Sequence, residues 1–132
     1  MSELREQIRE TIEREPVVAF VKGTHEQAYC GNSERAMQAL RAVGASFAAV
    51  DVLPDPAIRQ ELSALSNWPT IPQVFVGGEL IGGADIVQEL AASGGLEAKL
   101  DEKLGDEWRN GGAERTIALT ESGSGNPFRV VG

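Results

Sequence analysis

The single cysteine of the chain, Cys30, stands between two segments of different pattern. A β-branched apolar run at residues 17–21 predicts a buried strand before it, and apolar spacing at residues 34–43 predicts a helix after it. A helix N-terminus favours the thiolate, which is the form that attacks disulfides and binds metals. An inert buried cysteine is the alternative, but the neighbours Tyr29 and Asn32 are not typical of a core. We therefore expect Cys30 to be reactive.

Ser33 lies three residues after Cys30, where a second cysteine would complete a two-thiol redox motif. Serine forms no disulfide, but its hydroxyl can bond a sulfur atom or cap a helix, and the sequence leaves both roles open. Cys30 must therefore use a thiol from outside the chain to resolve a mixed disulfide, or it must serve another chemistry.

Two further segments carry groups suited to binding. The proline of Thr70-Ile71-Pro72 either starts a strand or follows a cis bond that would leave the Ile71 backbone able to pair with an extended ligand. Asp85 follows a Gly-Gly pair; it can cap a helix, or join nearby amides in binding the amine and carboxylate of a ligand. Lys22 and Arg59, taken alone, are typical of solvated charges.

The predicted elements alternate in a way that fixes the fold class. Helices are expected at residues 3–14, 34–43, 56–65 and 86–104, and strands at 17–21, 46–52, 73–76 and 79–81. The helical pattern at 86–104 is interrupted at Gly94-Gly95. The strand–helix–strand half predicts a parallel pair, and the Gly77-Gly78 turn predicts an antiparallel hairpin. We expect an α/β fold in which a four-stranded mixed sheet has helices on both faces.

The chain changes character after residue 104. Residues 105–132 are rich in glycine, and we expect a flexible tail that docks in part through Trp108 or Phe128; a hairpin between residues 116–120 and 128–131 is the alternative. The predicted domain is therefore 1–104, with 105–132 as an appendage.

Composition narrows the function classes. The net charge of −8 argues against nucleic acid and anionic membranes as partners. The sequence contains no run long and apolar enough to cross a membrane, and residues 1–8 lack a secretory pattern. One cysteine permits no internal disulfide, so we expect a reducing, cytoplasmic environment.

Taken together, these features resemble the monothiol glutaredoxins. The matching runs are Lys-Gly-Thr at 22–24, Cys-Gly-Asn-Ser at 30–33, Trp-Pro-Thr-Ile-Pro-Gln at 68–73 and Gly-Gly-Ala-Asp-Ile at 82–86. The resemblance covers about residues 3–104 and implies a thioredoxin-like fold. It also implies that Cys30 is the nucleophile and the iron ligand. The residues implied to hold glutathione, or a similar small thiol, are Lys22, Arg59, Thr70, Ile71, Pro72, Ala84 and Asp85.

The resemblance further implies a carrier that binds a 2Fe–2S cluster as a homodimer, is otherwise a monomer, and supplies apo iron–sulfur proteins in iron homeostasis. Two chains and two glutathione thiols would provide the four thiolates that such a cluster needs. The alternatives are a glutathione-dependent thiol–disulfide oxidoreductase, which needs one cysteine, and an adaptor that acts through its tail. Asn32 departs from the usual Cys-Gly-Phe-Ser motif, and we expect it to expose a cluster to solvent and shorten its life.

Overall fold

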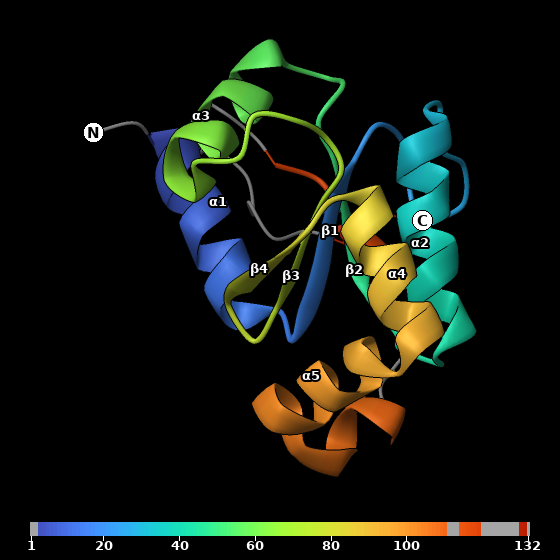
Figure 1. Cartoon of the computed structure of the whole chain (residues 1–132). Coiled ribbons are helices and arrows are strands. Elements are labelled where there is room, and N and C mark those ends of the chain that lie inside the picture. The colour runs from blue at the N-terminus through green and yellow to red at the C-terminus, as the bar shows by residue number, and fades with distance from the viewer. Residues whose placement is uncertain (1–2, 111–113, 120–129, 132) are drawn as a thin grey trace.

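The computed structural model of the chain describes residues 3–110, 114–119 and 130–131. Its elements follow in the order α1 (Glu3–Arg14), β1 (Val17–Val21), α2 (Gly31–Ala42), β2 (Ala48–Asp51), α3 (Pro56–Ser66), β3 (Gln73–Val76), β4 (Glu79–Gly82), α4 (Ala84–Ser93), α5 (Gly95–Leu104), the 3-10 helix η1 (Gly105–Asn110), β5 (Arg115–Ile117) and β6 (Val130–Val131). Figure 1 shows a central sheet with α1 and α3 on one face and α2 and α4 on the other.

The sheet is mixed, as the sequence predicts. Strand β1 lies in its centre, parallel to β2 and antiparallel to β3. The β3–β4 hairpin turns at Gly77 and Gly78, which both have positive φ, a backbone conformation that side chains disfavour. The predicted α/β class, with helices on both faces, is confirmed.

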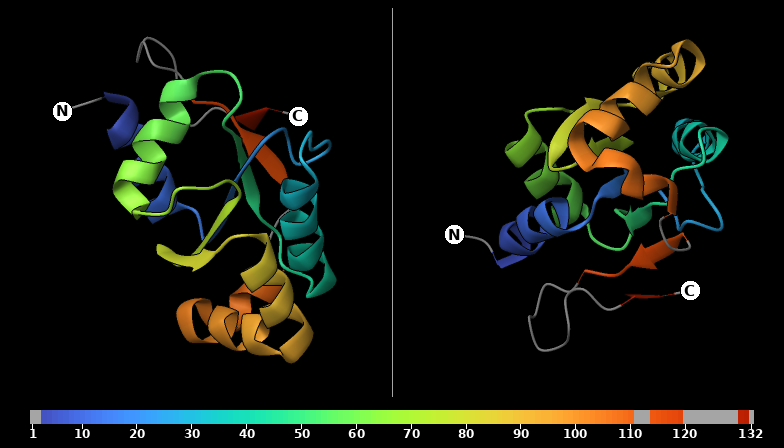
Figure 2. Two further views of the ribbon diagram at one scale, coloured as in Figure 1. Left: turned by 45° about the horizontal axis from the view of Figure 1, so that its top comes forward. Right: turned by 90° about the horizontal axis from the view of Figure 1, so that it is seen from below.

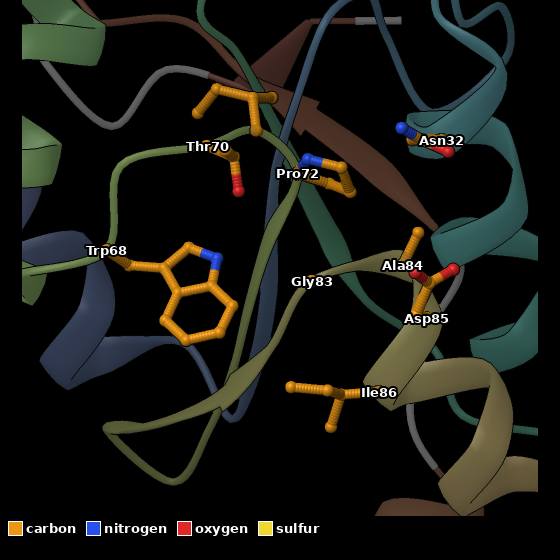
Figure 3. Close-up of a pocket in the computed structure, with 9 residues that line it drawn as sticks. Asn32, Trp68, Thr70, Pro72, Gly83, Ala84, Asp85 and Ile86 are labelled. Carbon is orange, nitrogen blue, oxygen red and sulfur yellow. The ribbon is translucent and has the colours of Figure 1, made fainter.

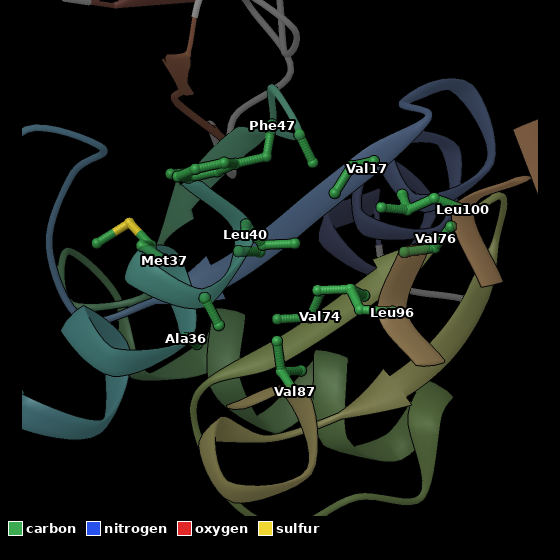
Figure 4. Close-up of a cluster of buried hydrophobic side chains, with 14 of the residues drawn as sticks. Val17, Ala36, Met37, Leu40, Phe47, Val74, Val76, Val87, Leu96 and Leu100 are labelled. Atoms are coloured by element: carbon green, nitrogen blue, oxygen red, sulfur yellow. The ribbon is translucent and has the colours of Figure 1, made fainter. Parts of the chain in front are cut away.

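Alternation along the central strand builds two cores. Val17, Ala19 and Val21 of β1 join the cluster under α2, α4 and α5, which Figure 4 shows. Val18 and Phe20 point the other way and join the cluster under α1 and α3. Because a strand buried on both faces loses its polar alternation, residues 17–21 read as a continuous apolar run.

The helices start and end with identifiable chemistry. Asp55 caps α3, since its Oδ1 accepts the backbone N–H of Ala57 at 2.9 Å, and Pro56 occupies the first turn. Helix α2 begins at Gly31, three residues earlier than expected, which makes Cys30 itself the residue that precedes the helix. The helical pattern at residues 86–104, which the sequence interrupts at Gly94-Gly95, forms two helices separated at Gly94, whose φ is +87°.

The described sheet has six strands instead of the expected four, in the order β4-β3-β1-β2-β5-β6. The additional strands come from the segment after residue 104. Strand β5 pairs in parallel with β2, and β6 pairs antiparallel with β5, as Figure 2 shows at the edge of the sheet. This segment therefore covers the edge that β2 would otherwise expose.

Trp108 anchors the same segment. Its side chain is 6% exposed, packs in the cluster under α5, and donates its Nε1–H to Asp101 at 2.8 Å. The Arg109 guanidinium lies 4.2 Å from the centre of the ring. Partial docking through Trp108 is thus observed, whereas Phe128 lies outside the described residues.

Over the described residues, none of the helices combines the length and the apolar character that a bilayer span requires.

Candidate functional site

Cys30 lies at the end of a narrow loop that leads from β1 into α2. Gly23 and Ala28 form an isolated bridge across the loop, and the backbone N–H of Tyr29 donates to the Lys22 carbonyl at 2.8 Å. Cys30 has extended backbone angles and is the N-cap of α2, where its carbonyl accepts the N–H of Glu34 at 3.0 Å. The thiol is partly exposed and unpaired. Cys30, which the sequence predicts to be reactive, therefore lies at the N-terminus of α2 and not in the core.

The surroundings of Cys30 favour its thiolate. Burial raises the pKa of the thiol, but backbone N–H groups of Ser33 and Asn32, the Ser33 hydroxyl and the charge of Lys22 all lower it, and the net pKa lies below the ordinary value. These donors are the first amides of α2, which have no partner within the helix. The arrangement supplies an ionised sulfur for nucleophilic attack or metal ligation.

Ser33 is fully buried and ties the loop to the helix. Its Oγ accepts the backbone N–H of Lys22 at 3.1 Å and also hydrogen-bonds the Cys30 thiol. Because Cys30 precedes the helix, Ser33 does not cap it, so of the two roles left open the structure favours the interaction with sulfur. The hydroxyl occupies the place of a second thiol and fixes the first one.

A cavity of about 300 Å³ has Asn32, two residues after Cys30, in its lining. It brings together five of the predicted binding residues, which are Thr70, Ile71, Pro72, Ala84 and Asp85. Figure 3 shows Thr70 and Pro72 across the cavity from Asn32 and Asp85. Trp68, Gly83 and Ile86 complete the lining, and the sequence analysis did not single them out for binding.

Hydrogen bonds from a buried side chain fix the proline-rich segment 68–72 that lines this cavity. The Ile71–Pro72 bond is cis, as one of the two sequence hypotheses has it. The side-chain amide of Gln73 donates to the carbonyls of Trp68 and Thr70 at 2.8 and 3.1 Å. Gln73 is fully buried, so these bonds fix the loop where it faces the cavity.

A second cavity, of about 640 Å³, brings the two predicted cations together. Lys22 comes from the end of β1 and Arg59 from α3, and Pro69 lies between this cavity and Thr70. Arg59 donates to the Pro69 carbonyl at 3.5 Å. Two cations in one open groove suit a carboxylate, which each would attract only weakly alone.

Arg35 makes contacts that no sequence pattern predicts. It projects from α2 to the start of α4, where its Nη2 lies 2.6 Å from Asp85 Oδ1. Its Nη1 donates to Asn32 Oδ1 at 2.8 Å, and its Nε donates to Gln88 Oε1 at 2.9 Å. Asn32 therefore serves as a polar acceptor at the position where the resemblance leads one to expect phenylalanine.

The docked C-terminal segment reaches the loop that carries Cys30. The backbone N–H of His25 donates to Thr116 Oγ1 at 2.9 Å, and His25 Nδ1 lies 2.7 Å from the same oxygen. Arg41 bridges the two segments, since it bonds the His25 carbonyl and both carboxylate oxygens of Glu114. Residues 114–116 thus help to hold the loop in place.

The described residues form no metal site of their own. In the described ranges 3–110, 114–119 and 130–131, no group of three or more His, Cys, Asp or Glu side chains is placed to hold a metal ion. The Cys30 thiolate is a group that could ligate a metal.

Comparison with known proteins matches this geometry. The family model described as Glutaredoxin matches residues 17–81, which include Cys30 and Pro72. Glutaredoxin 4 of Escherichia coli K12 is 45% identical over 102 residues, which cover 77% of this chain and 89% of that protein. Monothiol glutaredoxin-S11 of Oryza sativa subsp. japonica is 46% identical over 99 residues, which cover 75% of this chain but only 20% of that longer protein.

A solved structure extends the comparison to the fold. The crystal structure of a buckwheat glutaredoxin–glutathione complex aligns with a TM-score of 0.66 and 28% identity, over 75% of this chain and 88% of that chain. The expected thioredoxin-like architecture is therefore confirmed, with β5 and β6 added at one edge.

Proposed function

The chain belongs to the glutaredoxin family, and from this premise we propose that it is a monothiol glutaredoxin that carries a 2Fe–2S cluster. Cys30 and glutathione hold the cluster between two copies of the chain, and apo iron–sulfur proteins receive it. Residues 1–104 carry this function, the segment 105–132 supports it through its described residues that dock on the domain, such as Trp108 and Thr116, and the location is cytoplasmic.

One observation carries the proposal. The only thiol of the chain is partly exposed at the start of α2, with its pKa lowered by helix amides, Ser33 and Lys22 against the effect of burial. A thiolate that can meet solvent, beside two cavities, is suited to share a metal centre with a small thiol.

The two cavities fit the two ends of glutathione. The groove with Lys22 and Arg59 suits the glycine carboxylate, because both cations line it. The cavity with Ala84 and Asp85 suits the γ-glutamyl end, since it offers a carboxylate beside the first amides of α4. Thr70, Ile71 and Pro72 lie between these ends and shape the middle of the groove. The solved relative from buckwheat contains glutathione, which supports this choice of ligand.

The donor set favours a shared cluster. A 2Fe–2S centre takes four thiolates, and each chain has one cysteine. Two chains and two glutathione molecules complete the set without any further protein ligand. Asn32 is exposed beside Cys30, so we expect water to reach the cluster and limit its lifetime.

Anaerobic reconstitution tests the proposal. The protein is incubated with ferrous iron, sulfide and glutathione, and its visible absorption and molecular mass are measured. We expect a coloured dimer that loses its colour when glutathione is omitted, and a colourless monomer for Cys30→Ser. A colourless wild-type protein under the full conditions would contradict the proposal.

A glutathione-dependent oxidoreductase is the second candidate, and the exposure of Asn32 favours it because a large mixed disulfide can approach Cys30. The Cys30 thiolate attacks the glutathione sulfur of a protein mixed disulfide, forms a new S–S bond, and releases the protein thiolate, which takes a proton from water. A second glutathione thiolate then attacks the glutathione sulfur on Cys30. The products are glutathione disulfide and the Cys30 thiolate, so one disulfide is reduced for each one formed.

Turnover separates the two candidates. A glutathionylated protein substrate is supplied with excess glutathione, and the release of glutathione disulfide is followed. Turnover that disappears in Cys30→Ser, in a protein that forms no coloured dimer, would establish the oxidoreductase in place of the carrier.

A further inference from the structure

Arg35 makes a fork of hydrogen bonds that joins two helices at the rim of the cavity. Its guanidinium bonds Asn32 on its own helix, and Asp85 and Gln88 on α4. The side chain is 41% exposed and the Asp85 side chain 88% exposed, so solvent and ligands can reach both. Because Asp85 lines the cavity, Arg35 places a positive charge next to the negative charge that the cavity presents.

The fork has capacity for a further acceptor. A guanidinium has five N–H donors, and the bonds to described residues use one on Nε, one on Nη1 and two on Nη2. One Nη1–H therefore has no acceptor among the described residues. Two of the three present acceptors, Asn32 and Gln88, are neutral amides, and a carboxylate would bind a guanidinium more strongly than either.

We propose that Arg35 is a specificity residue, which with Asp85 selects thiol ligands that end in an unmodified α-amino acid. This inference rests on the proposed binding of glutathione and names how its γ-glutamyl end is read. Asp85 accepts the α-ammonium group, and Arg35 donates to the α-carboxylate through Nη1. A ligand with only one of these charges engages only one of the two side chains and therefore gains only one of the two charged contacts.

Asn32 helps to orient Arg35 for this role. Phenylalanine at this position offers no acceptor to Nη1, whereas the Asn32 amide oxygen holds Arg35 at 2.8 Å in the orientation that faces Asp85. The departure of this chain from the Cys-Gly-Phe-Ser pattern and the presence of the arginine are therefore explained by one interaction.

Ligand analogues test the inference directly. We would titrate reduced glutathione, an analogue that lacks the α-carboxylate (4-aminobutanoyl-cysteinyl-glycine) and one that lacks the α-amine (glutaryl-cysteinyl-glycine), and follow binding by NMR. The proteins are the wild type, Arg35→Gln, Arg35→Lys and Arg9→Gln. Arg9 pairs with Glu6 on α1, so its variant matches the loss of charge away from the cavity.

Wild-type protein should bind glutathione more tightly than either analogue. Arg35→Gln should weaken glutathione binding by about fivefold, as expected for one partly exposed charge pair, and should leave the analogue without a carboxylate nearly unaffected. Arg35→Lys should recover part of the loss, since it restores the charge but not the fork. Arg9→Gln should match the wild type.

Two results would overturn the inference, and they differ. If wild-type protein binds glutathione and Arg35→Gln binds it equally well or more tightly, Arg35 only occludes Asp85, and the proposed function survives without this role. If wild-type protein binds neither glutathione nor the analogues, the proposed function fails together with the inference.

Discussion

Replacing Ser33 by alanine should weaken both the fold and the thiolate. Ser33 is fully buried, and its hydroxyl is the acceptor for the Lys22 backbone N–H. Removing it leaves that N–H without an acceptor at a partly buried position, which costs about 1–2 kcal/mol. Against a total stability of about 5–15 kcal/mol for a domain of this kind, such a loss is easily measured.

Equilibrium unfolding in urea gives the magnitude. We expect the midpoint of Ser33→Ala to fall while the slope stays constant, since the area exposed on unfolding is unchanged. Ser63→Ala is the matched control: within the described residues the Ser63 Oγ is buried without a hydrogen-bond partner, so its removal should cost nothing. If the two variants unfold at the same urea concentration, the bond from Lys22 to Ser33 does not stabilise the protein.

The same variant should react more slowly with iodoacetamide at neutral pH. The Ser33 hydroxyl is one of the groups that lower the Cys30 pKa, so its loss raises that pKa and reduces the thiolate fraction. An unchanged alkylation rate in Ser33→Ala would refute the role of the hydroxyl at the sulfur, whatever happens to stability.

Three further outcomes are expected. Trp108→Ala should lower the free energy of unfolding by about 3–5 kcal/mol, as for other buried aromatic side chains, whereas Arg109→Ala should lower it by at most about 1 kcal/mol. Equal effects of the two substitutions in urea unfolding would show that the Trp108 ring does not anchor the segment. Thr116→Val should lower the free energy of unfolding by about 1 kcal/mol and Thr116→Ser by much less, because only serine keeps the oxygen that bonds His25. Identical urea midpoints for the two variants would argue against this bond. The free energy of unfolding of the wild type, relative to that of Cys30→Ser, should rise as the pH increases from the lowered Cys30 pKa to the ordinary 9.0, because the unfolded chain holds the thiol proton to higher pH. Below the lowered pKa this pH-dependent contribution should vanish. A difference between the two proteins that is independent of pH would contradict the lowered pKa.

Local patterns were sufficient for the central architecture. The apolar run at residues 17–21 marks a strand that is buried on both faces, and Gly77-Gly78 marks a hairpin, because each signal depends on neighbouring residues alone. The sequence pattern predicts that α2 starts at residue 34, whereas the helix starts at Gly31, because glycine and asparagine have low helix propensity and the N-terminal turn is stabilised by its surroundings.

Local sequence patterns do not predict the two C-terminal strands, β5 and β6. Strand β5 has three residues, and its stability comes from pairing with β2, more than sixty residues earlier in the chain. A sequence pattern of three residues carries no usable period, so the sequence favours a flexible tail, whereas the described strands β5 and β6 pair antiparallel, as the hairpin alternative has it.

The sequence alone identifies candidate binding residues, but only the fold shows which of them lie together. The predicted residues divide between two cavities, with Lys22 and Arg59 in one and the five others in the second. The pairing of Arg35 with Asp85 joins residues fifty positions apart. An arginine on an exposed helix face has no feature that distinguishes this role from that of an ordinary solvated charge.

The pH dependence of Cys30 alkylation shows whether the fold lowers the pKa of the thiol. The rate constant with iodoacetamide is measured from pH 4 to 11 for the folded protein and again in denaturant, which provides the ordinary thiol of the same chain. We expect a folded-state midpoint clearly below the denatured one, so that the folded protein holds more of the sulfur as thiolate at neutral pH. A folded-state midpoint equal to or above the denatured one would contradict this expectation.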